Sequence, residues 1–148
     1  MNIQIVSLGK RLIFLGAVLF MLGLIQGLLI PYFYNSRMAL SGHLAAVQGG
    51  MALMVFGLIW GLLILKKRWL TLAYYSSILS MYLIWVAITL SAILGASKSL
   101  PIAGEGFSSS YLIEMGVSVI LYIGSAAGVT SIVLIVWGLY KSTSEPTG

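Results

Sequence analysis

Charged residues are scarce in this chain, and cysteine is missing from it. Only 7% of its 148 residues are charged and 60% are hydrophobic, whereas soluble domains carry about 25% charged residues. So few charges cannot cover a surface that faces water, which excludes a soluble protein. The lack of cysteine excludes disulfides, zinc–thiolate sites, thiol nucleophiles and cysteine-held iron–sulfur clusters. We therefore expect one integral membrane domain spanning residues 1–148.

Four apolar runs dominate what remains, at about residues 12–30, 43–65, 69–94 and 115–140. Each has the roughly 20 residues that a helix needs to cross a bilayer. The runs do not alternate apolar and polar residues as strands of a membrane barrel would. The sequence thus predicts an all-α integral membrane four-helix bundle, followed by a polar tail over residues 141–148. A cleaved signal peptide fits the first run less well, because that run is too long and lacks a small-residue cleavage site.

The basic residues predict how the bundle is oriented. Six of the eight Lys and Arg residues fall at the N-terminus, in the second loop and at the C-terminus, and two fall in the first and third loops. Positive residues accumulate on the cytoplasmic side, so both termini are expected to be cytoplasmic. These charges flank apolar runs and form no stripe, so nucleic acid is not an expected partner; the lipid bilayer is.

Glycines spaced four apart occur in three of the runs: Gly23 and Gly27, Gly57 and Gly61, and Gly124 and Gly128. Such pairs let two helix backbones approach closely. They are typical of packing within a bundle, and they also occur where subunits of an oligomer meet.

Ionisable residues are nearly missing at membrane depth. Glu114 opens the fourth run, where a carboxylate favours the positive end of a helix dipole; a proton-relay role is the less favoured reading. The first run holds a single amide, Gln26, and no acid. A proton-coupled multidrug exporter, which needs a membrane-embedded acid, is therefore not expected.

His43 is the only histidine, and it lies where a polar loop turns into the second apolar run. A zinc site would need more ligands than this chain offers, but haem iron accepts a single axial imidazole. Gly50 and Met51 share its helix face and leave adaptable space for a flat ligand. Read without further information, an interfacial histidine bonded to a loop or headgroup is the simpler interpretation.

Several segments resemble the hydroxylaminobenzene mutases. The resemblance rests on Ser36–Leu44, on Tyr82, Trp85 and Thr89, on Leu100–Gly104 and on Ile132–Leu139. It covers all four runs in order. That family is similar to the styrene oxide isomerases, which are trimers of four-helix membrane proteins that bind haem b through a histidine. The resemblance therefore implies haem b on His43, a homo-oligomer such as a trimer, and an isomerase without net redox chemistry.

The resemblance also implies a substrate and roles for nearby residues. Mutases of this kind move a hydroxyl group from nitrogen to an aromatic ring, and the isomerases open an epoxide, so we expect a small aromatic hydroxylamine or epoxide. A ferric iron acting as a Lewis acid on the substrate oxygen would serve both reactions. The expected roles fall to Arg37 as partner of a haem propionate, to Gln48 and Tyr82 as catalytic groups that orient the substrate, and to Met51 and Trp85 as pocket residues. Arg37 could equally face lipid headgroups, and interior packing is the simpler reading of Trp85.

The chain departs from the family pattern at Gly49 and Ile84, where the family carries asparagines suited to a polar substrate. Those departures favour a competing hypothesis: a non-enzymatic structural subunit or small-solute channel on the same scaffold. In either case we expect location in a bacterial inner membrane.

Overall fold

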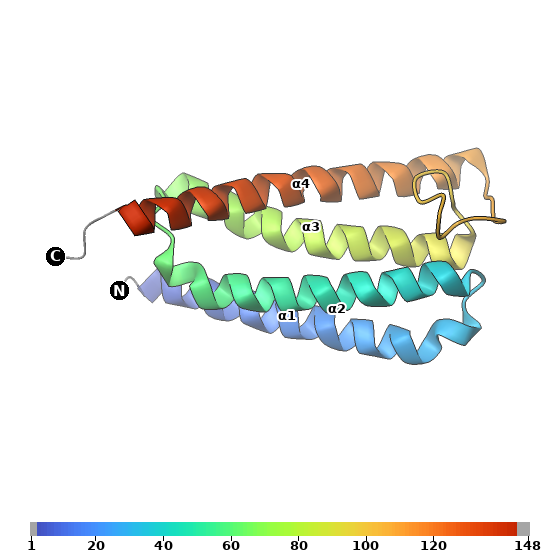
Figure 1. The fold of residues 1–148 in the computed structure, drawn as a ribbon, viewed down its shortest axis with the longest axis horizontal. Coiled ribbons are helices and arrows are strands. Elements are labelled where there is room, and N and C mark those ends of the chain that lie inside the picture. Colours follow the sequence, from blue (N-terminus) through green and yellow to red (C-terminus); the bar gives the residue numbers. More distant parts are fainter. Residues whose placement is uncertain (1–2, 145–148) are drawn as a thin grey trace.

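The computed structural model describes the chain from residue 3 to residue 144, with side chains from residue 6 onward. Four helices account for most of it: α1 (Ile3–Leu29), α2 (Ser36–Ile59), α3 (Lys67–Leu94) and α4 (Tyr111–Ser144). No residue between 3 and 144 lies in a strand. Each helix is long and apolar enough to cross a membrane, which confirms the predicted all-α membrane bundle (Figure 1).

α3 ends at Leu94 as predicted, but most other helix ends differ from the predicted spans, because local hydrogen bonding as well as hydropathy sets them. α1 runs about three turns ahead of residue 12 and carries Lys10 within it. α2 starts at Ser36, capped by Asn35. It gives way at residue 60 to a 3-10 turn that ends at residue 62, before the predicted end at residue 65. The predicted tail begins inside α4, which is helical to Ser144; residues 145–148 lie outside the described residues.

The helices pack in sequence order. The most extensive contacts join α1 to α2 and α3 to α4, α2 and α3 connect the two pairs, and α1 meets α3 only slightly. Figure 1 shows the start of α1 and the end of α4 at one end of the bundle (the terminal end) and the loop between α3 and α4 at the other. The assignment of the terminal end to the cytoplasm remains a prediction.

Glycines join α1 to α2 at matched levels. A Cβ on Gly9 would lie 2.7 Å from the carbonyl oxygen of Gly57, and a Cβ on Gly57 would lie 2.6 Å from that of Gly9. Gly16 and Gly50 repeat the arrangement at 2.6 and 2.7 Å. The two backbones are therefore in contact. In a bilayer the hydrophobic effect does not drive helices together, so close packing through dispersion and weak Cα–H···O interactions stabilises their association.

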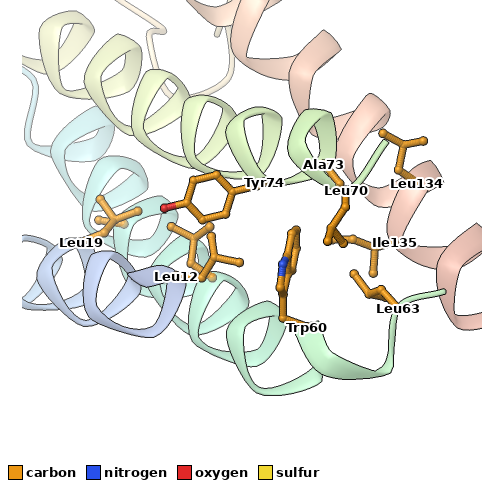
Figure 2. Close-up of a cluster of buried hydrophobic side chains, with 11 residues drawn as sticks. Leu12, Leu19, Trp60, Leu63, Leu70, Ala73, Tyr74, Leu134 and Ile135 are labelled. Carbon is orange, nitrogen blue, oxygen red and sulfur yellow. The ribbon is translucent and has the colours of Figure 1, made fainter. Parts of the chain in front are cut away.

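A layer of large side chains fills the bundle at the terminal end (Figure 2). Trp60 and Tyr74 meet edge to face with ring centroids 6.0 Å apart, and Leu12 and Leu19 of α1 pack beside them. Between α3 and α4 the packing is more polar, with the Ser77 and Ser131 hydroxyls hydrogen-bonded at 2.5 Å. The Trp60–Tyr74 layer therefore joins the two helix pairs, whereas the Ser77–Ser131 bond joins α3 to α4 within one pair.

The loop between α3 and α4 is tied down at the other end of the bundle. The carboxylate of Glu114 accepts hydrogen bonds from the backbone N–H groups of Ser97, Lys98 and Ser109 at distances from 2.9 to 3.3 Å. Glu114 therefore fastens both ends of the loop to the start of α4, which adds a specific function to the dipole effect expected from the sequence. The loop residues Leu100 and Ala103 pack over α2 and α3.

Gly50→Ala should destabilise the bundle by about 1–3 kcal/mol, because the added Cβ would lie 2.6 Å from the Phe20 backbone nitrogen and overpacking of this kind carries that cost. The measurement is thermal unfolding in detergent. Gly116→Ala is the matched control, since no heavy atom lies within 4 Å of a Cβ there and alanine is the better helix former. Equal melting temperatures for the two variants would contradict the proposed importance of the α1–α2 contact.

Candidate functional site

Asn35 fixes the start of α2 and hence the position of His43. Its side-chain oxygen accepts a hydrogen bond from the Met38 N–H at 3.0 Å and caps the helix. Its backbone N–H donates to the carbonyl of Ala92 in α3, and its amide nitrogen donates to the carbonyl of Ala103 in the outer loop. Asn35 is fully buried, so one residue ties α2 to α3 and to the loop, two turns before the histidine.

His43 is half-buried between α2 and α1. Its Nδ1 lies 2.8 Å from the carbonyl oxygen of Gly23 in α1. A carbonyl can only accept a hydrogen bond, so Nδ1 must carry the proton and Nε2 of the neutral ring keeps its lone pair. Within residues 6–144, no hydrogen bond to Nε2 is formed. This arrangement, one ring nitrogen held by a carbonyl and the other free, is the one found in histidines that bind metals.

Gly23 and Gly27 make the space that the imidazole occupies. A Cβ on Gly27 would lie 2.8 Å from Nδ1 of His43, and a Cβ on Gly23 would meet the α2 residues Ala46 and Val47. The glycine pair that the sequence suggests for helix packing thus also accommodates the candidate ligand.

Gln26 organises a second group of contacts inside the bundle, close to His43. Its amide oxygen accepts hydrogen bonds from Nε1 of Trp85 at 2.6 Å and from the hydroxyl of Thr89 at 3.1 Å. Its amide nitrogen donates to the carbonyl of Ala39 at 3.1 Å, one turn before His43. Gln26 is only 4% exposed, so its bonds join α1, α2 and α3 in the interior.

Gln48 lies in a groove on the other side of α2. The groove, between α2 and α3, has a volume of about 280 Å³. Its lining consists of Ala45, Gln48, Gly49, Ala52, Met81 and Ile84. Five residues separate His43 from Gln48, which turns them about 140° apart on the helix. His43 therefore faces α1 while Gln48 faces α3, and a single chain does not bring the two into one cavity.

The other residues proposed from the sequence are scattered around this site. The Tyr82 hydroxyl donates to the carbonyl of Leu15 in α1 at 2.9 Å, and the Trp85 ring nitrogen is bonded to Gln26. Met51 is 44% exposed on the outward face of α2. Arg37 forms an exposed ion pair with Glu105 of the outer loop, at 3.5 Å.

Sequence reasoning missed Asn35, the Gly23 carbonyl as a partner of His43, and the interior role of Gln26. For Gln26 a signal was present, because it is the one polar side chain in the first apolar run and a buried amide must find partners. The Gly23 carbonyl carries no such signal, since any backbone oxygen could serve. Its role emerges only when the two helices are placed side by side.

Gln26→Leu should lower the stability of the bundle by about 1–3 kcal/mol, because the Trp85 N–H and the Thr89 hydroxyl lose their acceptor. A double-mutant cycle with Trp85→Phe, measured by unfolding in detergent, should give a coupling energy of about 1 kcal/mol. Ser125→Ala on the exposed face of α4 is the control and should change little. Additive effects of Gln26→Leu and Trp85→Phe would mean that the two side chains do not cooperate.

Comparisons with known proteins fit this geometry. Residues 8–140 match the family model described as styrene oxide isomerase. Hydroxylaminobenzene mutase HabA of Ectopseudomonas oleovorans is 38% identical over 108 residues, which cover 72% of this chain and 80% of that protein. Hydroxylaminobenzene mutase HabB of the same organism is 35% identical over 139 residues, covering 93% and 85%. No solved structure matches the chain.

These matches confirm the predicted resemblance and bear on the two functions left open by the sequence. Both relatives are named as mutases and the family is named for an isomerase, so the non-enzymatic alternative gives way to an enzyme of the isomerase or mutase type. The matched region runs from the first turns of α1 almost to the end of α4 and includes His43 and the groove. The chain belongs to the styrene oxide isomerase family.

Proposed function

We propose that this protein is a haem-dependent isomerase of the bacterial inner membrane that rearranges a small aromatic hydroxylamine or epoxide. One observation carries the proposal: the hydrogen bond from Nδ1 of His43 to the Gly23 carbonyl, which leaves Nε2 available as a ligand. Within the described residues, no three His, Cys, Asp or Glu side chains gather to hold a metal ion. A lone histidine suffices when a porphyrin supplies the remaining ligands.

The surroundings of His43 suit haem b. The carbonyl partner of Nδ1 fixes the orientation and the tautomer of the ring, with Nε2 unprotonated. Leu40 and Leu44, each close to half exposed in the single chain, flank the histidine with the apolar surface that a porphyrin face requires. The Arg37–Glu105 pair is exposed on both sides, and such pairs contribute little stability. Arg37 can therefore exchange Glu105 for a haem propionate at small cost.

The groove between α2 and α3 is the proposed substrate site. Ala45, Ala52 and Ile84 give it apolar walls, and the Met81 thioether can contact an aromatic ring. Gln48 is its one polar lining residue, with an amide that both donates and accepts hydrogen bonds. We propose that Gln48 orients the nitrogen or oxygen of the substrate. When bound, haem would supply a ferric Lewis acid for the substrate oxygen.

Tyr82 and Trp85 take more limited parts in this proposal than the sequence suggested. The Tyr82 hydroxyl is already bonded to the Leu15 carbonyl, so it orients substrate only by exchanging that partner for a substrate oxygen. The Trp85 ring nitrogen is held by Gln26, and its ring packs in the core between α1 and α3. We propose that Trp85 supports the wall of the site.

The proposal requires more than one copy of the chain. His43 and Gln48 face different sides of α2, and Met51 lies between them on the exposed face. At the level of His43 and Met51, the α1–α2 side of one subunit would then meet the α2–α3 groove of the next, with Met51 in the pocket between them. Such a head-to-tail contact closes into a ring, and we propose a homo-oligomer, with a trimer as the expected ring.

The absorption spectrum of the purified, haem-replete protein tests the cofactor. We expect a Soret band in the wild type and its loss in His43→Ala, with unchanged helicity because the ring is only half-buried. Added imidazole should restore the band in His43→Ala by occupying the vacated position, whereas His43→Ala without imidazole stays unable to isomerise substrate. A wild-type protein that shows no Soret band would sink the haem proposal.

Turnover of phenylhydroxylamine and of styrene oxide tests the substrate groove. Gln48→Leu should lower kcat/KM by about tenfold or more, because a lost hydrogen bond to substrate costs on the order of 1–2 kcal/mol. Its Soret band should stay at the wild-type position. Thr130→Val, a polar-to-apolar change on the exposed side of α4, is the control. If Gln48→Leu and Thr130→Val behave alike, the groove does not hold the substrate.

A further inference from the structure

A second groove lies between α1 and α2 at the terminal end of the bundle, several turns from His43. It has a volume of about 230 Å³, and its lining includes Gly9, Lys10, Ile13, Gly57, Leu58 and Gly61. Pockets that enclose drug-sized ligands measure about 300–1,000 Å³, so this groove is too small for haem or for a ligand with several rings. Its long apolar walls fit a segment of a hydrocarbon chain.

Lys10 makes the mouth of this groove positive. Within residues 6–144, Lys10 forms no ion pair and no contact with an aromatic ring. Two other basic side chains at the same end make cation–π contacts. The Arg68 guanidinium lies 5.0 Å from the centroid of the Trp69 ring, and the Lys141 ammonium lies 4.4 Å from that of the Trp137 ring. Among residues 6–144, the Lys10 ammonium therefore has no anionic or aromatic partner in the groove lining.

Among residues 6–144, every charged side chain at the terminal end is basic. The two acids among residues 6–144 are Glu105 and Glu114, which lie in the loop and helix start at the opposite end. Arg11 and the cluster of residues 66–68 add positive charge around the groove. No described acid competes at this end for the Lys10 ammonium, so an anion from the surroundings is its natural partner.

From this combination we infer a binding site for one anionic phospholipid. The phosphate contacts Lys10 at the membrane surface, and an acyl chain lies in the groove against Gly57 and Leu58. A lysine near the end of a membrane span places its ammonium among headgroups while its methylene stem stays in apolar surroundings, and basic pockets between membrane helices select anionic headgroups. This inference is independent of the proposed isomerase activity.

Native mass spectrometry of the detergent-purified protein tests the site with phosphatidylglycerol and phosphatidylcholine of identical acyl chains. The wild type should retain one phosphatidylglycerol more tightly than phosphatidylcholine. Lys10→Gln should weaken phosphatidylglycerol retention by about fivefold, the effect of one interfacial lysine, and Lys10→Arg should restore it. Lys67→Gln, at the same end but outside the groove lining, is the matched control.

Two outcomes would overturn the inference. The first is equal loss of phosphatidylglycerol in Lys10→Gln and Lys67→Gln, which would mean diffuse attraction to a basic surface. The second is occupation of the groove by another copy of the chain. Because the chain has no cysteine, the variant Leu58→Cys reports on that case directly: a disulfide-linked dimer formed in membranes would place a subunit where the lipid is expected.

Discussion

The contact between α1 and α2 is the constraint on which the rest of the structure depends. Two α-helices usually lie 8–10 Å apart, because their side chains keep the two backbones separated. Glycines at matched levels remove that barrier, and a row of reciprocal close approaches leads up to His43. The bond from His43 to the Gly23 carbonyl exists because the backbones are already together.

Polar side chains at membrane depth are few, and most of them have a structural assignment. In hydrocarbon a buried polar group without a partner is costly, and the chain meets this demand by bonding side chains to backbone carbonyls or to one another. Gln26 alone joins three helices. Among the described residues, Trp60 Nε1 and Ser80 Oγ are buried without a partner. Gln48 differs from both, because it lies exposed in an apolar groove and forms no hydrogen bond within residues 6–144. The Gln48 amide forms no hydrogen bond that stabilises the fold, so we infer that it is available to bind a ligand.

Much of the fold was predictable from the sequence, because hydropathy and length decide how many helices cross a membrane. The helix ends were less predictable, since Asn35 sets the start of α2 through partners in α3 and the outer loop, which lie far away in the sequence. For the site, the residue types were identified but their relative placement was not. His43 and Gln48 are close in sequence and were expected to share a pocket, yet the direction in which each faces depends on which neighbour lies on each side of α2. Hydropathy alone does not determine that choice.

The placement of His43 and Gln48 on opposite sides of α2 has a genetic consequence. On the proposed arrangement, each reaction centre is assembled from two polypeptides, one of which contributes the histidine and the other the groove. A chain defective only at the histidine still offers an intact groove to its neighbour, and a chain defective only in the groove still offers an intact histidine. Two such alleles expressed together would complement each other within mixed oligomers, although neither is active alone. Each active site of this protein would then lie at the interface between two subunits.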